Sequence, residues 1–125
     1  MEIINTNNAP APIGPYSQAT VAGNFVFVSG QIPLNPATGE LVTSGIKDEA
    51  VLVMENIKAI LTEAGIGFAN VVKTSIFLTD LGNFGQVNEV YGTYFTANFP
   101  ARETVQVSAL PKGVNVEISV IALKD

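Results

Sequence analysis

One stretch of helical periodicity, set between segments with strand character, most constrains the fold of this 125-residue chain. From about residue 48 to residue 64, apolar residues recur at steps of three and four, which predicts one apolar stripe along a helix. Gly65 supplies a natural end to that helix. Glu49 and Glu55 are expected at ordinary exposed positions. The predicted stripe consists of Ala50, Val51, Met54, Ile57, Leu61 and Ala64.

Short β-prone segments precede and follow this helix. Gly23-Asn24 separates two of them and is a hairpin signal. The last two are joined through residues 110–113, and we expect them to form a second hairpin. Two helices on one face of a mostly antiparallel sheet give an α+β fold, with residues 1–125 as a single domain. The predicted strands are 17–22, 25–29, 71–78, 102–108 and 114–123, and the second helix is about 84–95.

The composition excludes several classes of function. The chain has no histidine and no cysteine, so it has no imidazole base, no thiolate nucleophile and no Cys/His zinc site. A net charge of −5 without any basic run disfavours nucleic-acid binding. No apolar run is long enough to cross a membrane, and the polar start is unlike a signal peptide, so we expect a cytoplasmic protein. Only 14% of residues are charged, against about 25% in typical domains, which favours subunit contacts.

Arg102 is the only arginine in the chain, and it stands at the start of a predicted strand. A guanidinium binds a small carboxylate through two parallel hydrogen bonds, which makes Arg102 a candidate carboxylate clamp. The alternative is an exposed arginine at a strand end, balanced by the neighbouring Glu103.

Strand alternation suggests partners for Arg102. It places Arg102 and Thr104 on one face of their strand. Matching the apolar faces of the two strands in the predicted last hairpin then places Thr104 opposite Glu117. Arg102 is the next residue on the same face, with its Cβ atom about 7–8 Å diagonally from that of Glu117. This surface is either a solvated sheet face with a cross-strand ion pair or a polar site enclosed by an oligomer interface. Ile121 and Leu123, which continue the face, favour the second interpretation.

Weaker signals lie elsewhere. Ser29-Gly30 ends a predicted strand and either exposes backbone donors to a ligand or simply forms a turn. Tyr16 either covers a pocket or packs beneath its proline-rich loop. Asn88 and Tyr91 lie three residues apart on the second helix, where Tyr91 suits the core and Asn88 the surface.

Four motifs, in order, cover nearly the whole chain, and together they resemble the Rid (YjgF) family, particularly its RidA-type reactive-intermediate deaminases. The motifs are residues 11–18 (APIGPYSQ), 29–33 (SGQIP), 99–102 (FPAR) and 116–118 (VEI), with the Asn88 and Tyr91 region between them. The resemblance implies a chorismate-mutase-like fold assembled as a homotrimer, with sites between subunits. It also implies hydrolysis of 2-imino acids released by pyridoxal-phosphate enzymes, such as 2-iminobutanoate and 2-iminopropanoate, to 2-oxo acids and ammonia. Such metabolite damage control is linked to isoleucine biosynthesis, and it needs neither cofactor nor metal.

The resemblance also implies roles for individual residues. Arg102 would clamp the substrate carboxylate, and Glu117 would orient or activate water. Many RidA-type members carry cysteine where this chain has Thr104. The threonine removes any thiol chemistry, and we expect it to alter substrate preference. The residues expected to line the pocket are Tyr16, Ser29, Gly30, Asn88, Arg102 and Thr104.

Two other functions remain open from the sequence. The same cleft could bind 2-oxo acids or similar small carboxylates in a regulatory protein without turnover. Endoribonuclease or translation-inhibitor activity has been attached to relatives, but the acidic composition and the missing histidine argue against it.

Overall fold

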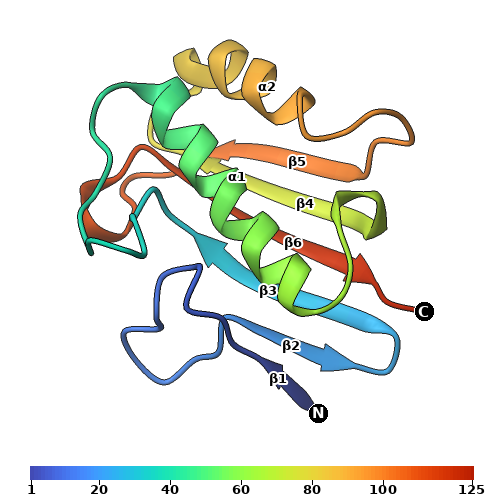
Figure 1. The fold of residues 1–125 in the computed structure, drawn as a ribbon. Coiled ribbons are helices and arrows are strands. Elements are labelled where there is room, and N and C mark those ends of the chain that lie inside the picture. The colour runs from blue at the N-terminus through green and yellow to red at the C-terminus, as the bar shows by residue number, and fades with distance from the viewer.

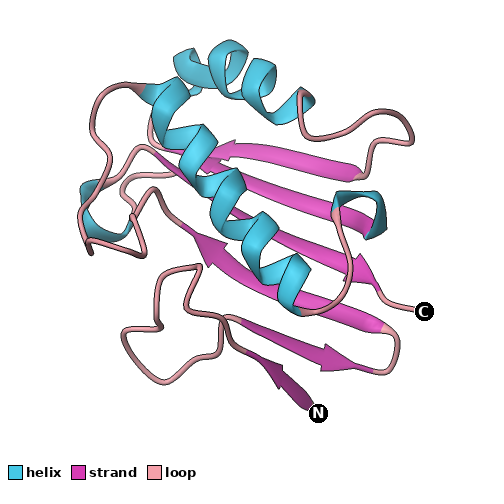
Figure 2. Cartoon of the chain, in the orientation of Figure 1, coloured by secondary structure: helices cyan, strands magenta, loops and turns pink.

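A computed structural model describes all 125 residues, and it confirms the α+β prediction. Two helices lie on the same face of a six-stranded sheet (Figure 1, Figure 2). Neither helix is both long and apolar enough to cross a membrane. The strands are β1 (Glu2–Ile4), β2 (Ala19–Ala22), β3 (Phe25–Gln31), β4 (Val71–Leu78), β5 (Ala101–Gln106) and β6 (Val116–Leu123), and the helices are α1 (Ile46–Glu63) and α2 (Phe84–Gly92).

The sheet order is β1-β2-β3-β6-β4-β5, and only the β4–β5 pair is parallel. The predicted hairpin at Gly23-Asn24 is confirmed, since Ala22 pairs with Phe25 and Gly23 has the positive φ that such a turn favours. Strand β6 comes last in the sequence but lies between β3 and β4. The connection from β3 to β4 through α1 therefore passes over β6, and α2 connects β4 to β5.

The predicted hairpin between 102–108 and 114–123 is wrong, because β4 separates β5 from β6. Thr104 pairs with Ile76 of β4, whereas Glu117 pairs with the next residue, Phe77, and so points to the opposite face. The prediction failed because β5 is an edge strand, and its alternation of polar and apolar residues does not indicate which face lies toward the helices. Arg102, Thr104 and Gln106 lie on the helix side, whereas Glu103 and the 40% exposed Val105 lie on the open face.

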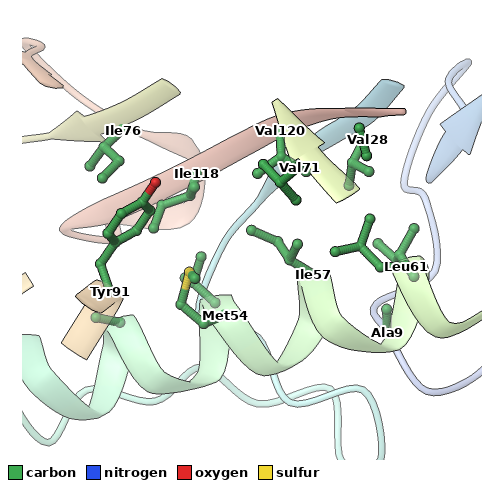
Figure 3. Packing of buried hydrophobic residues seen from close by; sticks show 14 of the residues in the cluster. Ala9, Val28, Met54, Ile57, Leu61, Val71, Ile76, Tyr91, Ile118 and Val120 are labelled. Atoms are coloured by element: carbon green, nitrogen blue, oxygen red, sulfur yellow. The ribbon is translucent and has the colours of Figure 1, made fainter. Parts of the chain in front are cut away.

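The core lies between α1 and the middle of the sheet, where 23 buried residues form one cluster (Figure 3). Met54, Ile57 and Leu61 point from α1 toward β3 and β6. The predicted stripe was wrong at Val51, which is 42% exposed because it lies in line with Glu55 and Lys58 on the solvent side of α1. The buried residues of α1 also include Ala50, Val53 and Ile60, and unexpectedly Glu49 and Asn56.

A buried glutamine shapes the proline-rich loop that precedes β2. Gln18 is only 2% exposed, and its side-chain amide donates to the carbonyls of Thr6, Ala9 and Pro10. Its oxygen accepts from the backbone N–H of Thr6 at 2.7 Å. These bonds replace the regular backbone pairing that the prolines prevent, so one side chain determines the path of the loop.

We therefore expect Gln18→Ala to lower the free energy of unfolding by about 2–4 kcal/mol, because several buried backbone groups lose their partner. Urea unfolding at fixed protein concentration measures this change. Gln86→Ala, on the exposed side of α2, is the matched control and should stay within about 0.5 kcal/mol of the wild type. Equal stability of the two variants would contradict the role of Gln18.

Candidate functional site

The residues predicted to form the site fall into two clusters rather than one. The arginine cluster consists of Arg102 with Phe84, Asn88 and Tyr91 of α2, on the helix side of the sheet edge. The glutamate cluster consists of Tyr16, Ser29, Gly30 and Glu117, around the end of β3 and the start of β6. Each cluster lines its own cavity.

Arg102 is held on three sides. Its Nη1 donates to Asn88 Oδ1 at 2.7 Å, and its guanidinium carbon lies 5.5 Å from the ring centre of Phe84 and 5.0 Å from that of Tyr91. Such stacking on aromatic rings orients a guanidinium without using its N–H groups. Arg102 makes no other hydrogen bond and no ion pair within the chain, so its remaining donors are free for an anion.

The alternative pairing of Arg102 with Glu103 does not occur. Glu103 points to the open face of the sheet. There the Ser75 hydroxyl donates to its carboxylate, and Lys73 Nζ lies 3.1 Å from its Oε1. The hydrogen bond from Ser75 lowers the pKa of Glu103 most, and Lys73 lowers it further. The neighbouring carboxylate therefore has its own cation, and Arg102 has none of its charge neutralised by an ion pair.

Tyr91 supports the arginine from beneath. Its hydroxyl donates to Thr74 Oγ1 at 3.1 Å, and both residues are buried. Burial raises the pKa of Tyr91, against the opposing effects of the Thr74 bond and the Arg102 charge. The phenol is therefore a neutral platform at physiological pH. The adjoining cavity has a volume of about 490 Å³ and is lined by Asn88, Tyr91, Gly92, Phe99, Pro100 and Arg102.

A β-bulge forms the glutamate cluster. Val28 pairs with Val120 and Gln31 with Ile118, so three steps along β3 match two along β6. The extra residue lies in Ser29-Gly30, where a bulge can redirect the backbone. Ser29 is fixed by its hydroxyl, which donates to the carbonyl of Ser17 at 2.6 Å.

Gly30 leaves room for the carboxyl group of Glu117. A Cβ atom at residue 30 would lie 2.8 Å from Glu117 Cδ, which is closer than atoms can pack. Glu117 is half-buried and has neither an ion pair nor a hydrogen bond inside the chain. Burial therefore raises its pKa without any opposing partner. An unpaired carboxyl group of this kind is a candidate proton acceptor and donor.

The glutamate cluster opens into a cavity of about 550 Å³. The exposed loop before β2 forms one wall, and the turn before β6 forms another. Tyr16 stands at this cavity with an exposed side chain, as a residue that closes a pocket would. The remaining lining is formed by Pro10, Ala11, Ile13, Gln18, Gln31, Ile32, Leu34, Pro111 and Lys112.

The two clusters do not meet within one chain, which corrects the predicted 7–8 Å spacing of Arg102 and Glu117. Their strands are about 10 Å apart, with β4 between them, and their side chains point to opposite faces. Thr104 shares the face of Arg102 but lines neither cavity. Its hydroxyl oxygen is buried and has no hydrogen-bond partner.

The family model described as Endoribonuclease L-PSP matches residues 6–124. The chain belongs to the Rid (YjgF) family. A RutC family protein of Pyrococcus horikoshii is 54% identical over 99% of this chain and 98% of its own. A Rattus norvegicus protein named 2-iminobutanoate/2-iminopropanoate deaminase is 49% identical, covering 98% and 90%. The crystal structure of E. coli TdcF with bound serine has a TM-score of 0.96, with 44% identity and full coverage of both chains.

Sequence reasoning missed the aromatic support of Arg102 in this Rid protein. Phe84, Asn88 and Tyr91 lie at steps of four and three, so they share one face of α2. That spacing can be seen in the sequence. The parallel pairing of β4 with β5, which brings Arg102 to this face of α2, was not predicted, and so the contact was not predicted either. Phe99, Gln31 and Lys112 were also not predicted at the cavities.

The raised pKa of Glu117 predicts how stability depends on pH. Because ionisation is easier in the unfolded chain, stability falls as pH rises through the folded-state pKa. Glu117→Gln cannot ionise, so this variant should melt at a higher temperature than the wild type at pH 7. The difference should vanish below about pH 4. Calorimetry at fixed protein concentration measures it. Glu40→Gln, at an exposed glutamate, should show no such gain, and a gain equal to that of Glu117→Gln would contradict the argument.

Proposed function

We propose that this protein hydrolyses reactive 2-imino acids to 2-oxo acids and ammonia in the cytoplasm. The observation that carries the proposal is the half-buried Glu117 carboxyl group, which no residue of the chain neutralises and for which Gly30 leaves space. Arg102, oriented by aromatic rings and free of ion pairs, supplies the complementary carboxylate-binding group. Family membership supports the same chemistry, since the rat relative is named for it.

We further propose that each site forms between two copies in a homotrimer with the chorismate-mutase-like arrangement. A substrate of three or four carbons cannot reach from Arg102 to Glu117 within one chain, because the side chains lie on opposite faces. The open sheet face carries exposed apolar residues that suit burial by other copies. These are Ile3, Phe25, Phe27, Val105 and Leu123.

In the proposed reaction, Arg102 of one copy holds the substrate carboxylate through the N–H groups that Asn88 leaves free. Glu117 of the neighbouring copy accepts a proton from water as the oxygen attacks the imine carbon. That proton passes to the nitrogen and gives a carbinolamine. Glu117 then takes the hydroxyl proton of the carbinolamine and delivers it to the same nitrogen, so the C–N bond breaks and ammonia leaves as the carbonyl forms. The imine carbon is already electrophilic, so positioning of water accounts for much of the acceleration.

The remaining predicted residues have supporting roles in this proposal. Tyr16 covers the imine end, and Ser29-Gly30 brings backbone groups to it. Thr104 lies on the same face of β5 as Arg102, and its hydroxyl, which is buried and has no partner within the chain, is assigned no direct contact with the substrate. The bound serine in the TdcF structure supports a site for small amino-acid-like carboxylates. The proposed reaction needs no metal or organic cofactor, because water, a carboxyl group and a guanidinium complete it.

The direct test generates imine with an amino-acid oxidase and measures the release of 2-oxo acid. Purified protein at micromolar concentration should accelerate release over buffer, and Arg102→Ala should lower kcat/KM by about 100-fold because the carboxylate loses its clamp. Lys58→Ala, on the solvent side of α1, is the control and should match the wild type.

No acceleration by the wild type would overturn the deaminase proposal. Binding of 2-oxobutanoate in calorimetry, without turnover, would then favour the regulatory alternative. RNA cleavage that survived stringent purification and was lost in Arg102→Ala would favour a ribonuclease.

Sharing of sites between copies has its own test. Arg102→Ala and Glu117→Gln should each be inactive, but their equimolar mixture, refolded together, should recover about a quarter of the wild-type activity. In a ring that assembles at random, one boundary in four joins an intact Arg102 to an intact Glu117. A mixture as inactive as its components would contradict the shared site.

A further inference from the structure

Glu49 is a buried carboxyl group to which the proposed reaction gives no role. It lies in the first turn of α1, is 3% exposed and faces no cation within ion-pair distance. Burying a carboxyl group is unfavourable unless hydrogen bonds replace its hydration. The sequence predicted an ordinary exposed glutamate at this position, so its burial requires an explanation.

Both oxygens of Glu49 bind one residue of the turn that leads into β6. Oε1 accepts from the backbone N–H of Asn115 at 3.1 Å, and Oε2 accepts from Asn115 Nδ2 at 2.8 Å. Asn115 is 66 positions away in the chain, so the pair ties the start of α1 to the start of β6. The helix N-terminus is electrically positive, which also favours a carboxylate there.

The other polar groups of Asn115 bind the end of β4. Its carbonyl accepts from the backbone N–H of Thr79, and its Oδ1 accepts from Thr79 Oγ1, both at 3.3 Å. Asn115 thus joins α1, β4 and β6 at one point. We call Glu49, Asn115 and Thr79 the β6 clamp.

The β6 clamp lies immediately beside the glutamate cavity. Asn115 is two residues before Glu117, and the turn just before it places Pro111 and Lys112 on the cavity wall. Lys112 has a positive φ, a conformation that few side chains adopt and that the surrounding structure must maintain. Displacement of this turn would widen the cavity, expose the Glu117 carboxyl group further to water and change its distance from Gly30.

We infer that Glu49 is a positioning residue for Glu117, acting through Asn115 on the turn that walls the glutamate cavity. The inference rests on the proposed function for its kinetic consequence. Its structural content, that the β6 clamp maintains the surroundings of Glu117, does not depend on turnover. Lys112 is the one charged residue besides Glu117 at this cavity, so it must be considered in any titration there.

Glu49→Gln tests the inference with little change in shape. The amide replaces one of the two accepting oxygens with an NH2 group that can only donate, so one of the two bonds from Asn115 is lost. We expect kcat to fall about tenfold, with KM within about twofold of the wild type, because the water-handling group rather than the carboxylate clamp moves. We also expect the pKa of Glu117, measured by NMR of a ¹³C-labelled side chain, to fall as water enters.

A reciprocal exchange provides the rescue. In the double variant Glu49→Gln with Asn115→Asp, the NH2 group at position 49 donates to the new carboxylate at position 115. The side-chain oxygen at position 49 still accepts from the backbone N–H of position 115. Both kcat and the Glu117 titration should return toward the wild type. Glu55→Gln, on the solvent side of α1, is the matched control and should change neither. Should Glu49→Gln not fold, Asn115→Ala replaces it and must show the same two changes.

An unchanged kcat and an unchanged Glu117 titration in the single variant would overturn the inference. So would a double variant as impaired as the single one, or a loss confined to melting temperature. Failure of the proposed function is distinguishable, since a wild type without turnover still gives the NMR titration. A shift of that titration in Glu49→Gln, reversed in the double variant, would then support the β6 clamp alone.

Discussion

Burial of α1 against β3 and β6 is the interaction on which the rest of the molecule depends. It brings the last strand of the chain into the middle of the sheet, where β6 pairs with both β3 and β4. Hydrophobic contact across this layer is non-directional, but the hydrogen-bond register of the strands is not. The helix therefore supplies the cohesion, while the strand pairings determine which residues meet. The Ser29-Gly30 bulge and the β6 clamp are both consequences of where β6 lies.

In the candidate site, the two ionisable side chains are held in position by their surroundings but have no ionic partner within the chain. Arg102 is fixed by Asn88 and two rings, yet no carboxylate within the chain satisfies its charge. Glu117 is confined by packing, yet it has no partner for its carboxyl group. Proteins normally neutralise such groups internally, and leaving both unpaired is the arrangement expected where a ligand supplies the partner.

Local features were predictable from the sequence wherever one segment carried the information. The helix at 48–64, the Gly23-Asn24 turn and the strand at 114–123 were predicted correctly, because periodicity and turn chemistry act over a few residues. The pairing of β5 was not predictable in this way, since it depends on a parallel connection through α2. Glu49 shows the same limit. Its place in the helical pattern indicates exposure, and only the distant Asn115 explains its burial.

The bulge in β3 has a consequence for how this chain can vary. The bulge gives β3 one residue more than β6 between their paired positions. Deleting one residue at positions 29–30 would therefore restore a regular hydrogen-bond ladder with β6 and strengthen the sheet locally. The same deletion would withdraw the space that Glu117 occupies. A shorter chain at this point would therefore gain a regular sheet and lose the space for the Glu117 carboxyl group. Loops such as 35–40 are free of that constraint, and insertions and deletions should accumulate there instead.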